Sequence, residues 1–219
     1  MVSLDFAAVL TDWPLLLRGA AITVALTVVS AVVGVTVGVL CGWARAWGPR
    51  LLATAVAVYV ELIRNTPFIV QLFFIFFGLP SLGVRLSPEA ASVLAMVINL
   101  GAYAAEIVRA GIESTPRGQV EAGLSLALSR TQVFTRVVLP PALARVWPAL
   151  VSQIIIVMLG SAVCGQIAAQ ELSYFANLIQ SRNFRAFEAY IVATLVYLAL
   201  AVALRQLLRW IGGRFIFGR

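Results

Sequence analysis

Several polar side chains lie inside long apolar stretches and are the candidates for chemistry in this sequence. Glu61 and Arg64 stand three residues apart in the apolar stretch at residues 52–79, so on a helix they share one face and can pair. Charges at membrane depth are costly and usually face a bundle interior or a water-filled route. Two interpretations stay open: a polar path for a solute at the helix break expected at Pro67, or a structural ion pair that holds this kink.

Uncharged amides and hydroxyls in the same stretches could extend such a path. Together they suit a zwitterionic solute, although a hydrogen bond between helices is the favoured interpretation for any single one. The candidate pathway residues are Glu61, Arg64, Asn65, Thr66, Gln71, Asn99, Gln153, Ser161 and Gln166. A second pair, Glu106 and Arg109, repeats the three-residue spacing, and we interpret it as support for the loop that follows.

Catalytic and nucleotide-binding chemistry is excluded by the residue types present. Histidine is absent, every basic residue is arginine, and Cys41 and Cys164 lie within apolar stretches. We therefore expect neither a disulfide framework, nor a Cys/His zinc site, nor a His- or Cys-based nucleophile. A chain without lysine cannot build the P-loop that binds ATP. The acidic residues form no dense cluster, so we expect no enzymatic activity, no cofactor and no metal.

The composition indicates that this chain is embedded in a lipid bilayer. Hydrophobic residues make up 62% of the 219 residues and charged residues 11%, whereas a soluble domain carries about half apolar and about a quarter charged residues. Each apolar stretch exceeds the ~20 residues that cross a bilayer core of ~30 Å. We expect a single all-α membrane domain over residues 1–219, with five transmembrane helices roughly at residues 15–43, 52–79, 89–112, 144–169 and 187–208.

The arginines are distributed unequally between the two sides of such a membrane domain. If five spans alternate, eleven arginines fall on one side and four on the other, with Arg64 inside a span. The positive-inside rule places the carboxyl terminus and the loop at residues 113–143 in the cytoplasm and the amino terminus outside. The arginines lie mainly between the apolar stretches and form no basic patch, so we expect no nucleic-acid partner. The first residues show no basic region or cleavage site, and we expect no cleaved signal peptide.

Glycines recur at four-residue spacing in the first span. Gly34, Gly38 and Gly42 share one helical face and would let another helix approach closely. Two partners are conceivable for this face: a helix of the same subunit or a helix of a second copy. We favour packing inside one subunit.

The loop between the third and fourth spans carries the signals of two short helices. Thr115 precedes a proline and fits an N-cap, and Ser129 offers a cap for the second helix. Between them runs an apolar helical face with Glu121 at its rim. Such a small amphipathic unit either folds back on its own subunit or docks into another protein, and the residues alone leave both possibilities open.

This loop resembles the EAA loop of ATP-binding-cassette (ABC) importer permeases. That motif begins Glu-Ala-Ala and ends in an apolar residue, Leu and Pro; here Glu121 and Ala122 match its head and residues 138–140 (VLP) match its tail, at the family's spacing. Gly123 replaces the second alanine, and Ala127 stands where the family usually has the glycine of a sharp turn. Because alanine adopts a positive φ only with strain, we expect a differently built turn or altered coupling.

Further segments narrow the resemblance to permeases of polar amino-acid importers of the histidine, glutamine and arginine type. Their order and spacing cover nearly the whole chain after the first dozen residues. In the fourth span, Leu159 stands where many relatives carry lysine, so a role of that lysine does not carry over. The matching segments are residues 61–75 (ELIRNTPFIVQLFFI), 102–109 (AYAAEIVR), 116–119 (PRGQ) and 181–188 (SRNFRAFE).

The resemblance implies that this chain is the transmembrane subunit of a bacterial inner-membrane importer and has the fold of type I ABC importer permeases. The importer would move a polar or charged amino acid into the cytoplasm. The resemblance also implies four kinds of partner: a second permease subunit, identical or paralogous; cytoplasmic ATP-binding subunits; an extracytoplasmic amino-acid-binding protein; and membrane lipid. The loop would contain the coupling helix, and the coupling residues would be Arg117, Glu121, Ala122, Gly123, Leu124 and Ala127.

Two other classes remain as alternatives. An ion-coupled carrier or channel would use Glu61, Arg64 and Glu106 as a charge relay and need no ATPase partner. An integral-membrane enzyme would need paired carboxylates and a metal, which the scattered acidic residues do not favour. The residues do not name the transported amino acid, because carboxylates and arginine occur together within the spans.

Overall fold

The computed structural model describes residues 4–216, all in helices, turns and short connections without a strand. The prediction of no cleaved signal peptide rests partly on residues outside this range. The assignment of Arg219 to the cytoplasmic side rests wholly on a residue outside it. The elements are α1 (Ala7–Leu10), α2 (Trp13–Trp47), α3 (Arg50–Arg64), α4 (Phe68–Phe73), η1 (Phe74–Gly78), η2 (Leu79–Leu82), α5 (Pro88–Glu113), α6 (Arg117–Ser125), α7 (Arg130–Gln132), η3 (Val133–Val138), α8 (Leu139–Gly160), η4 (Ser161–Ile167), α9 (Leu172–Asn183), α10 (Ala186–Ile211) and η5 (Gly212–Ile216).

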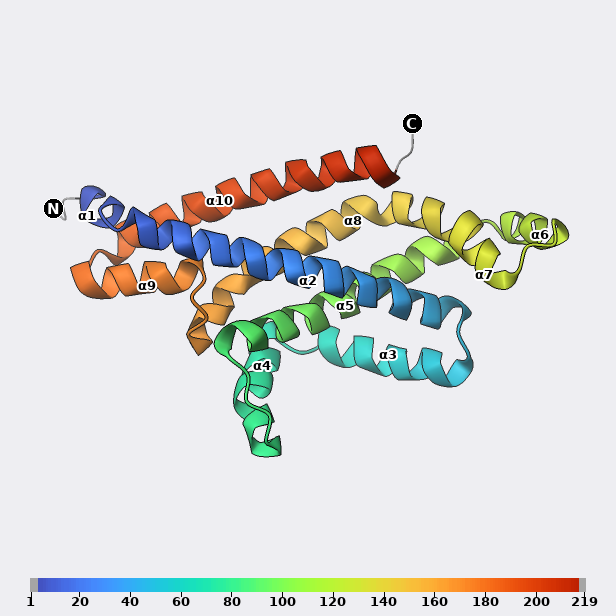
Figure 1. Ribbon diagram of the computed structural model, residues 1–219, viewed down its shortest axis with the longest axis horizontal. Coiled ribbons are helices and arrows are strands. Elements are labelled where there is room, and N and C mark those ends of the chain that lie inside the picture. The colour runs from blue at the N-terminus through green and yellow to red at the C-terminus, as the bar shows by residue number, and fades with distance from the viewer. Residues whose placement is uncertain (1–3, 217–219) are drawn as a thin grey trace.

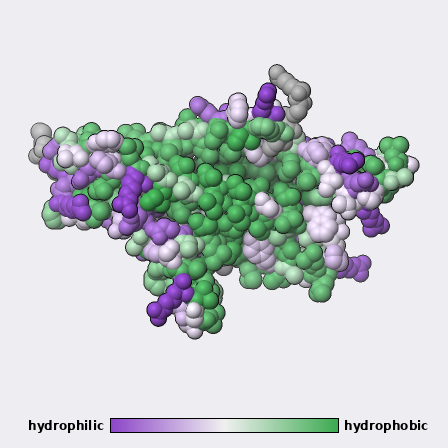
Figure 2. All heavy atoms as spheres, viewed as in Figure 1, coloured by the Kyte–Doolittle hydropathy of each residue, from purple (hydrophilic) through white to green (hydrophobic). Residues whose placement is uncertain are grey.

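Most of the long helices run along the long axis of the molecule (Figure 1). Four helical segments within residues 4–216 are long and apolar enough to cross a membrane: α2, α5, the run Arg130–Ile167 and the run Ala186–Phe215. A fifth crossing is formed if the pair α3 and α4–η2 is counted as one span, although this pair bends by 107°. Hydrophobic residues cover the middle of the long axis and hydrophilic residues gather toward its two ends (Figure 2).

The bend between α3 and α4 has a local cause. Pro67 has no N–H and disfavours helical geometry at the residue before it, so α3 ends at Arg64. Polar side chains then satisfy the carbonyls that the break leaves without helical partners. Asn65 Nδ2 donates to the Glu61 carbonyl oxygen at 2.8 Å, and Thr66 Oγ1 donates to the Leu62 carbonyl oxygen at 2.8 Å. The opening of the helix predicted at Pro67 is confirmed.

The glycine face of α2 packs on α5 of the same subunit. A Cβ atom added to Gly38 would lie 2.4 Å from the Ala104 Cβ, so the two helices touch at this point. Gly34 faces Leu100 in the same way, and Gly42 faces the next turn of α5. Packing inside one subunit, which the glycine spacing favoured, is confirmed.

The short helix α9 is an element that the apolar stretches did not predict. Its N-cap is the fully buried Glu171, whose Oε1 accepts a hydrogen bond from the Tyr174 N–H at 2.8 Å. Glu171 Oε2 accepts a hydrogen bond from the Tyr197 hydroxyl of α10, and Thr23 Oγ1 of α2 accepts one from the Leu172 N–H at 3.2 Å. These bonds hold α9 against both long helices at the end of the molecule that carries the amino terminus (Figure 1).

Candidate functional site

The helix break contains a network of amides that join three helices. The buried Gln71 of α4 donates from Nε2 to the carbonyl oxygens of Ile63 at 2.7 Å and Thr66 at 3.0 Å. Its Oε1 accepts a hydrogen bond from Asn99 Nδ2 of α5 at 3.0 Å. Gln71 and Asn99 therefore bind α4 and α5 to the end of α3, which is the interhelical role that the sequence favoured for single amides.

The ion pair considered between Glu61 and Arg64 is not formed. Glu61 Oε2 accepts a hydrogen bond from Asn65 Nδ2 at 2.9 Å, because the asparagine folds back over the last turn of α3. The Arg64 guanidinium instead lies over the ring of Tyr103 on α5, with its carbon 5.4 Å from the ring centroid. Arg64 is exposed and forms no salt bridge within residues 4–216. Within residues 4–216 the Arg64 guanidinium therefore contacts an aromatic ring and no carboxylate.

The remaining pathway candidates lie on the fourth span. Gln153 is half-buried on α8, and Gln166 is exposed in η4. Ser161 is buried and its Oγ donates to the Met158 carbonyl oxygen at 2.7 Å, so its hydroxyl serves the local helix. No hydrogen bond in the described part of the chain connects these three residues to the network around Gln71.

A chain of charged groups ties α2 to α5 next to the loop. Glu106 accepts hydrogen bonds from Arg45 of α2 and from Arg109, and Arg109 Nη1 also donates to Glu113 Oε1 at 2.6 Å. Glu106 and Arg109 are each about one-quarter exposed, at 25% and 26%, so water only partly screens this cluster. Its position at the end of α5 agrees with a supporting role for the loop.

The loop folds into the two helices that the sequence predicted, with one difference in their caps. Ser129 caps α7 in a reciprocal capping box: its Oγ accepts from the Gln132 N–H at 3.3 Å, and Gln132 Oε1 accepts from the Ser129 N–H at 2.8 Å. The N-cap of α6 is Pro116 and not Thr115. Because α6 begins at Arg117, Thr115 lies one residue before the N-cap; it is buried, and its hydroxyl finds no hydrogen-bond partner in the described residues.

Helix α6 lies at the extreme end of the long axis, beyond the membrane-length helices (Figure 1). Its inner face folds back on the subunit, because Gly123 is buried and an added Cβ would lie 3.1 Å from Val133 Cγ2. Its other faces point outward, and Leu126 just after the helix is 77% exposed. Of the predicted coupling residues, Gly123 is buried, and the exposed ones are Arg117, Glu121, Ala122, Leu124 and Ala127.

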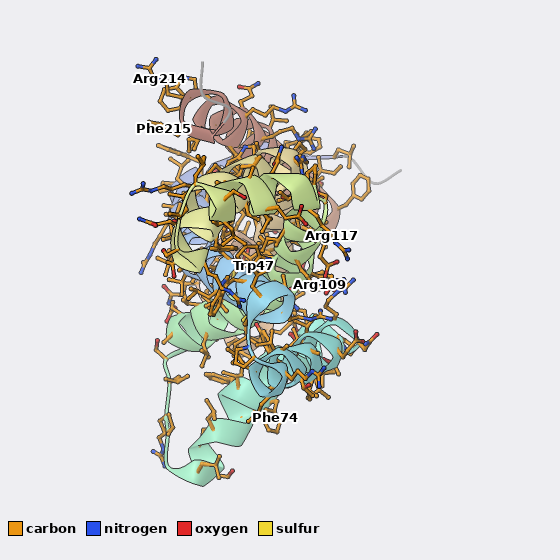
Figure 3. All side chains as sticks on the ribbon, turned by 90° about the vertical axis from the view of Figure 1, so that its right-hand side faces the viewer. Trp47, Phe74, Arg109, Arg117, Arg214 and Phe215 are labelled. Atoms are coloured by element: carbon orange, nitrogen blue, oxygen red, sulfur yellow. The ribbon has the colours of Figure 1, made fainter. Side chains whose placement is uncertain are left out.

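A hollow of about 550 Å³ separates α6 from the end of α2. Glu121 and Arg117 line it from α6, Trp47 and Glu113 line it from the ends of α2 and α5, and Thr115 lines it from the connection before α6. The end-on view shows Trp47, Arg109 and Arg117 around this end of the molecule (Figure 3). The exposed charges of α6 thus stand on a short helix that is packed on one side only.

The turn after α6 contains a residue in the left-handed backbone conformation, although that residue is alanine. Ala127 has φ 57°; its N–H donates to the Leu124 carbonyl oxygen at 3.0 Å, and the Leu128 N–H donates to the Gly123 carbonyl oxygen at 3.2 Å. These two bonds form a Schellman motif, in which glycine is the usual left-handed residue. The expectation of a differently built turn is therefore wrong: the hydrogen bonds of the sharp turn outweigh a left-handed strain of roughly 1–2 kcal/mol at Ala127.

We expect Ala127→Gly to stabilise the permease. Removing the left-handed strain is worth roughly 1–2 kcal/mol, and the greater freedom of glycine in the unfolded chain offsets about 0.4–1 kcal/mol of it. Thermal unfolding of the purified permease in detergent measures the difference. Ala122→Gly at an exposed helical position is the matched control and should lower stability by about 1 kcal/mol. Equal losses in both variants would contradict the strain at Ala127.

Comparison with known proteins agrees with this architecture. Residues 34–216 match the family described as "Binding-protein-dependent transport system inner membrane component". The glutamine transport system permease protein GlnP of Escherichia coli (strain K12) is 37% identical over 207 residues, which are 94% of each chain. The L-cystine transport system permease protein TcyB of Bacillus subtilis (strain 168) is 36% identical over 186 residues, 84% of this chain and 80% of the relative.

Solved structures show the same fold. An amino acid ABC transporter crystallised with histidines superposes with a TM-score of 0.87 at 32% identity, over 98% of this chain and 100% of that chain. The MetNI methionine ABC transporter in an inward-facing conformation superposes with a TM-score of 0.74 at 24% identity, over 92% and 94% of the two chains, which shows likeness of fold.

Fold and composition together define a multi-pass, all-helical membrane permease. The chain belongs to the binding-protein-dependent transport system inner membrane components, and within them to the permeases of amino-acid ABC importers. Members of this family are the non-enzymatic membrane components of their transport systems.

Proposed function

We propose that this permease carries a polar or charged amino acid into the cytoplasm and draws its energy from separate cytoplasmic ATP-binding subunits. The observation that carries the proposal is α6, a folded helix at the end of the molecule that is packed on one face and exposed on the others. Relatives named for glutamine and cystine support an amino acid as the solute. An extracytoplasmic binding protein delivers this solute to the opposite end.

A second permease subunit, identical or paralogous, completes the pathway. The arm formed by α4, η1 and η2 turns away from the other helices, and Figure 3 shows it with Phe74. Its large apolar side chains are exposed, including Phe74 at 72%, Phe77 at 63% and Leu82 at 78%. One chain with a broken second span cannot enclose a route across the bilayer by itself. A second subunit would both cover the arm and close the route.

The charged cluster gives α6 a mechanical connection to the spans. Arg45 and Glu106 join α2 to α5, and Arg109 and Glu113 continue the cluster to the start of the loop. Closure of the ATP-binding subunits around α6 would favour one of two arrangements of these helices, which is how a partner biases a two-state element. Glu106 is held by two arginines, which does not favour the ion-coupled alternative that needs it as a relay.

The proposed topology places α6 and the carboxyl terminus in the cytoplasm and the amino terminus outside a bacterial inner membrane. The excess of arginine on the α6 side of the alternating spans supports this orientation. In Figure 1 the amino terminus lies at the end opposite α6, and α10 runs back toward the α6 end. Helices α2 and α10 run between the two ends as this topology requires, whereas the bent pair α3 and α4–η2 turns away from the long axis.

Photocrosslinking tests the proposed partner of α6. A benzophenone amino acid placed at Leu126 should form an adduct with the ATP-binding subunit when the full transporter is illuminated, because this side chain is 77% exposed at the end of α6. Val33, 44% exposed in the apolar middle of α2, is the control position and should give no such adduct. An ATPase adduct at neither position, or at both equally, contradicts the docking of α6.

We expect Arg64→Ala to impair uptake more than assembly. A guanidinium that contacts a solute carboxylate contributes about 1.5–3 kcal/mol, so its loss should reduce uptake at low solute concentration at least ~tenfold. Initial rates of uptake in proteoliposomes of the full transporter measure this effect. Arg50→Ala removes an exposed arginine from the other end of α3 and should leave uptake within about twofold. Uptake by Arg64→Ala at unchanged affinity would remove Arg64 from the pathway.

A further inference from the structure

A groove of about 660 Å³ lies between the last turns of α2 and the helices α6, α7 and η3 of the loop at residues 113–143. Leu40, Trp43 and Trp47 line it from α2, and Leu124 and Phe134 line it from α6 and η3. This volume falls within the range of about 300–1,000 Å³ that small-molecule sites occupy. The groove is distinct from the helix break around Gln71 and lies on the opposite side of α2 from the glycine face.

Aromatic rings form the inner wall of this groove. The ring of Phe134 lies 6.4 Å from that of Trp43 in an edge-to-face arrangement and 5.6 Å from that of Trp47 in a tilted one, measured between centroids. Phe134 is buried, so this wall is fixed by packing within the subunit. Tryptophans at the level where apolar helix gives way to charged loop are typical of the membrane–water interface.

The mouth of the groove is continuous with the lipid-facing surface of α2. Leu40 is 61% exposed and Trp43 is 37% exposed at this mouth. Farther along α2, the apolar side chains of Val29, Val32 and Val33 are 46%, 64% and 44% exposed. An apolar chain can therefore reach the groove along α2, because the exposed Thr36 between Val32 and Leu40 donates its hydroxyl hydrogen to the Val32 carbonyl oxygen at 2.7 Å.

The mainly apolar lining contains one cationic side chain. Arg130 is the charged residue among the groove-lining residues, and it is exposed. It forms no salt bridge with a carboxylate anywhere in the described range. The hydroxyl-bearing Thr131 lines the groove beside it. The lining thus combines a long apolar wall with one positive charge, which complements an apolar chain that ends in an anionic group.

We propose that this groove binds one anionic phospholipid, with an acyl chain along Leu40, Trp43 and Phe134 and the headgroup phosphate at Arg130. Basic pockets between transmembrane helices at the membrane surface are known to suit such headgroups. Because α2, α6 and η3 all line the groove, the lipid would contact a membrane span and the coupling helix together. Anionic lipid would thereby hold α6 in place against α2, a role that the proposed transport function does not require.

Photocrosslinking to lipid tests this site in the full transporter. A benzophenone amino acid is placed at Leu40, and the complex is reconstituted in nanodiscs of equal amounts of phosphatidylcholine and phosphatidylglycerol. Mass spectrometry then gives the ratio of the two lipid adducts. We expect phosphatidylglycerol to be enriched about fivefold over phosphatidylcholine, the effect of one arginine near an anionic lipid. The same probe at Val32, which is 64% exposed on α2 outside the groove, should report the bulk ratio.

A matched pair of arginine substitutions decides between a specific site and general surface charge. Arg130→Gln should abolish the enrichment, whereas Arg136→Gln removes an exposed arginine outside the groove and should retain it. Both residues are exposed, so both variants should fold. The proposal is overturned by a bulk adduct ratio at Leu40, or by enrichment that persists in Arg130→Gln. A Leu40 adduct with a protein subunit in place of lipid also overturns it, because the groove would then be a protein interface.

Discussion

Glu121→Lys is expected to abolish solute-stimulated ATP hydrolysis and to leave the membrane fold intact. Glu121 is exposed on α6 and lines the hollow beside Arg117, so its carboxylate supports no buried contact of the spans. If α6 docks on the ATP-binding subunit, lysine replaces a desolvated negative charge by a positive one. Loss of one partner of a docked charge pair costs at least ~2 kcal/mol, so stimulation should fall about thirtyfold or more.

The measurement is ATP hydrolysis by the full transporter in proteoliposomes, with and without the solute-loaded binding protein. Gln119→Lys is the control, because residue 119 is exposed on the opposite face of the same helix and the substitution also adds a positive charge. It should keep most of the stimulation. Normal stimulation in Glu121→Lys would remove α6 from the coupling path, and equal loss in both variants would point to net charge in place of a specific contact.

Gly38→Leu is expected to have the largest effect on stability. A single Cβ at this position would lie only 2.4 Å from the Ala104 Cβ, so a leucine must force α2 and α5 apart. Overpacking of this kind costs about 1–3 kcal/mol and more where backbone must move. Since α2 and α5 form the central helix pair that the charged cluster joins at one end, we expect a loss of ~3 kcal/mol or more.

Thermal denaturation of the purified permease in detergent measures this loss of stability. Gly160→Leu is the matched control, because an added Cβ at Gly160 would meet no atom within 4 Å. It should change stability by less than about 1 kcal/mol, the scale of helix propensity. A Gly38→Leu variant as stable as Gly160→Leu would mean that α2 and α5 do not pack closely in the membrane.

Much of the architecture follows from patterns that are strong in a membrane protein. Apolar length predicts the long helices because the hydrocarbon thickness sets a minimum span. Proline at residue 67 predicts the break, and the glycine spacing predicts the close approach of α2 to α5. The helix that leads into the fourth span begins earlier than the apolar stretch, at Arg130, because the Ser129 capping box starts it there.

The details of the polar sites were harder to predict because spacing along one helix says little about partners on other helices. Glu61 and Arg64 have the spacing of a pair, but Asn65 caps α3 and Tyr103 of α5 offers its ring to the arginine. Glu106 pairs with Arg109 at the same spacing, and its second partner, Arg45, comes from α2. Only the packing of α2 against α5 brings these groups together.

Two local features, the left-handed residue Ala127 and the short helix α9, depend on hydrogen bonds that conformational preferences of single residues do not predict. Ala127 adopts the left-handed conformation because the turn bonds at the end of α6 favour it over the preference of alanine. The helix α9 is too short and too polar to stand out as a span, yet the buried carboxylate of Glu171 starts it and Tyr197 anchors it. A glutamate directly before Leu172 was the available signal for its N-cap.

The most direct test of the account is accumulation of a radiolabelled amino acid, one that the cognate binding protein captures, in proteoliposomes. The account predicts accumulation against a gradient when the permease is reconstituted with its ATP-binding subunits and supplied with ATP and the binding protein. It predicts no accumulation when ATP or the ATP-binding subunits are omitted. Accumulation of the amino acid against its gradient by the permease alone would contradict the claim that this chain is driven from outside through α6.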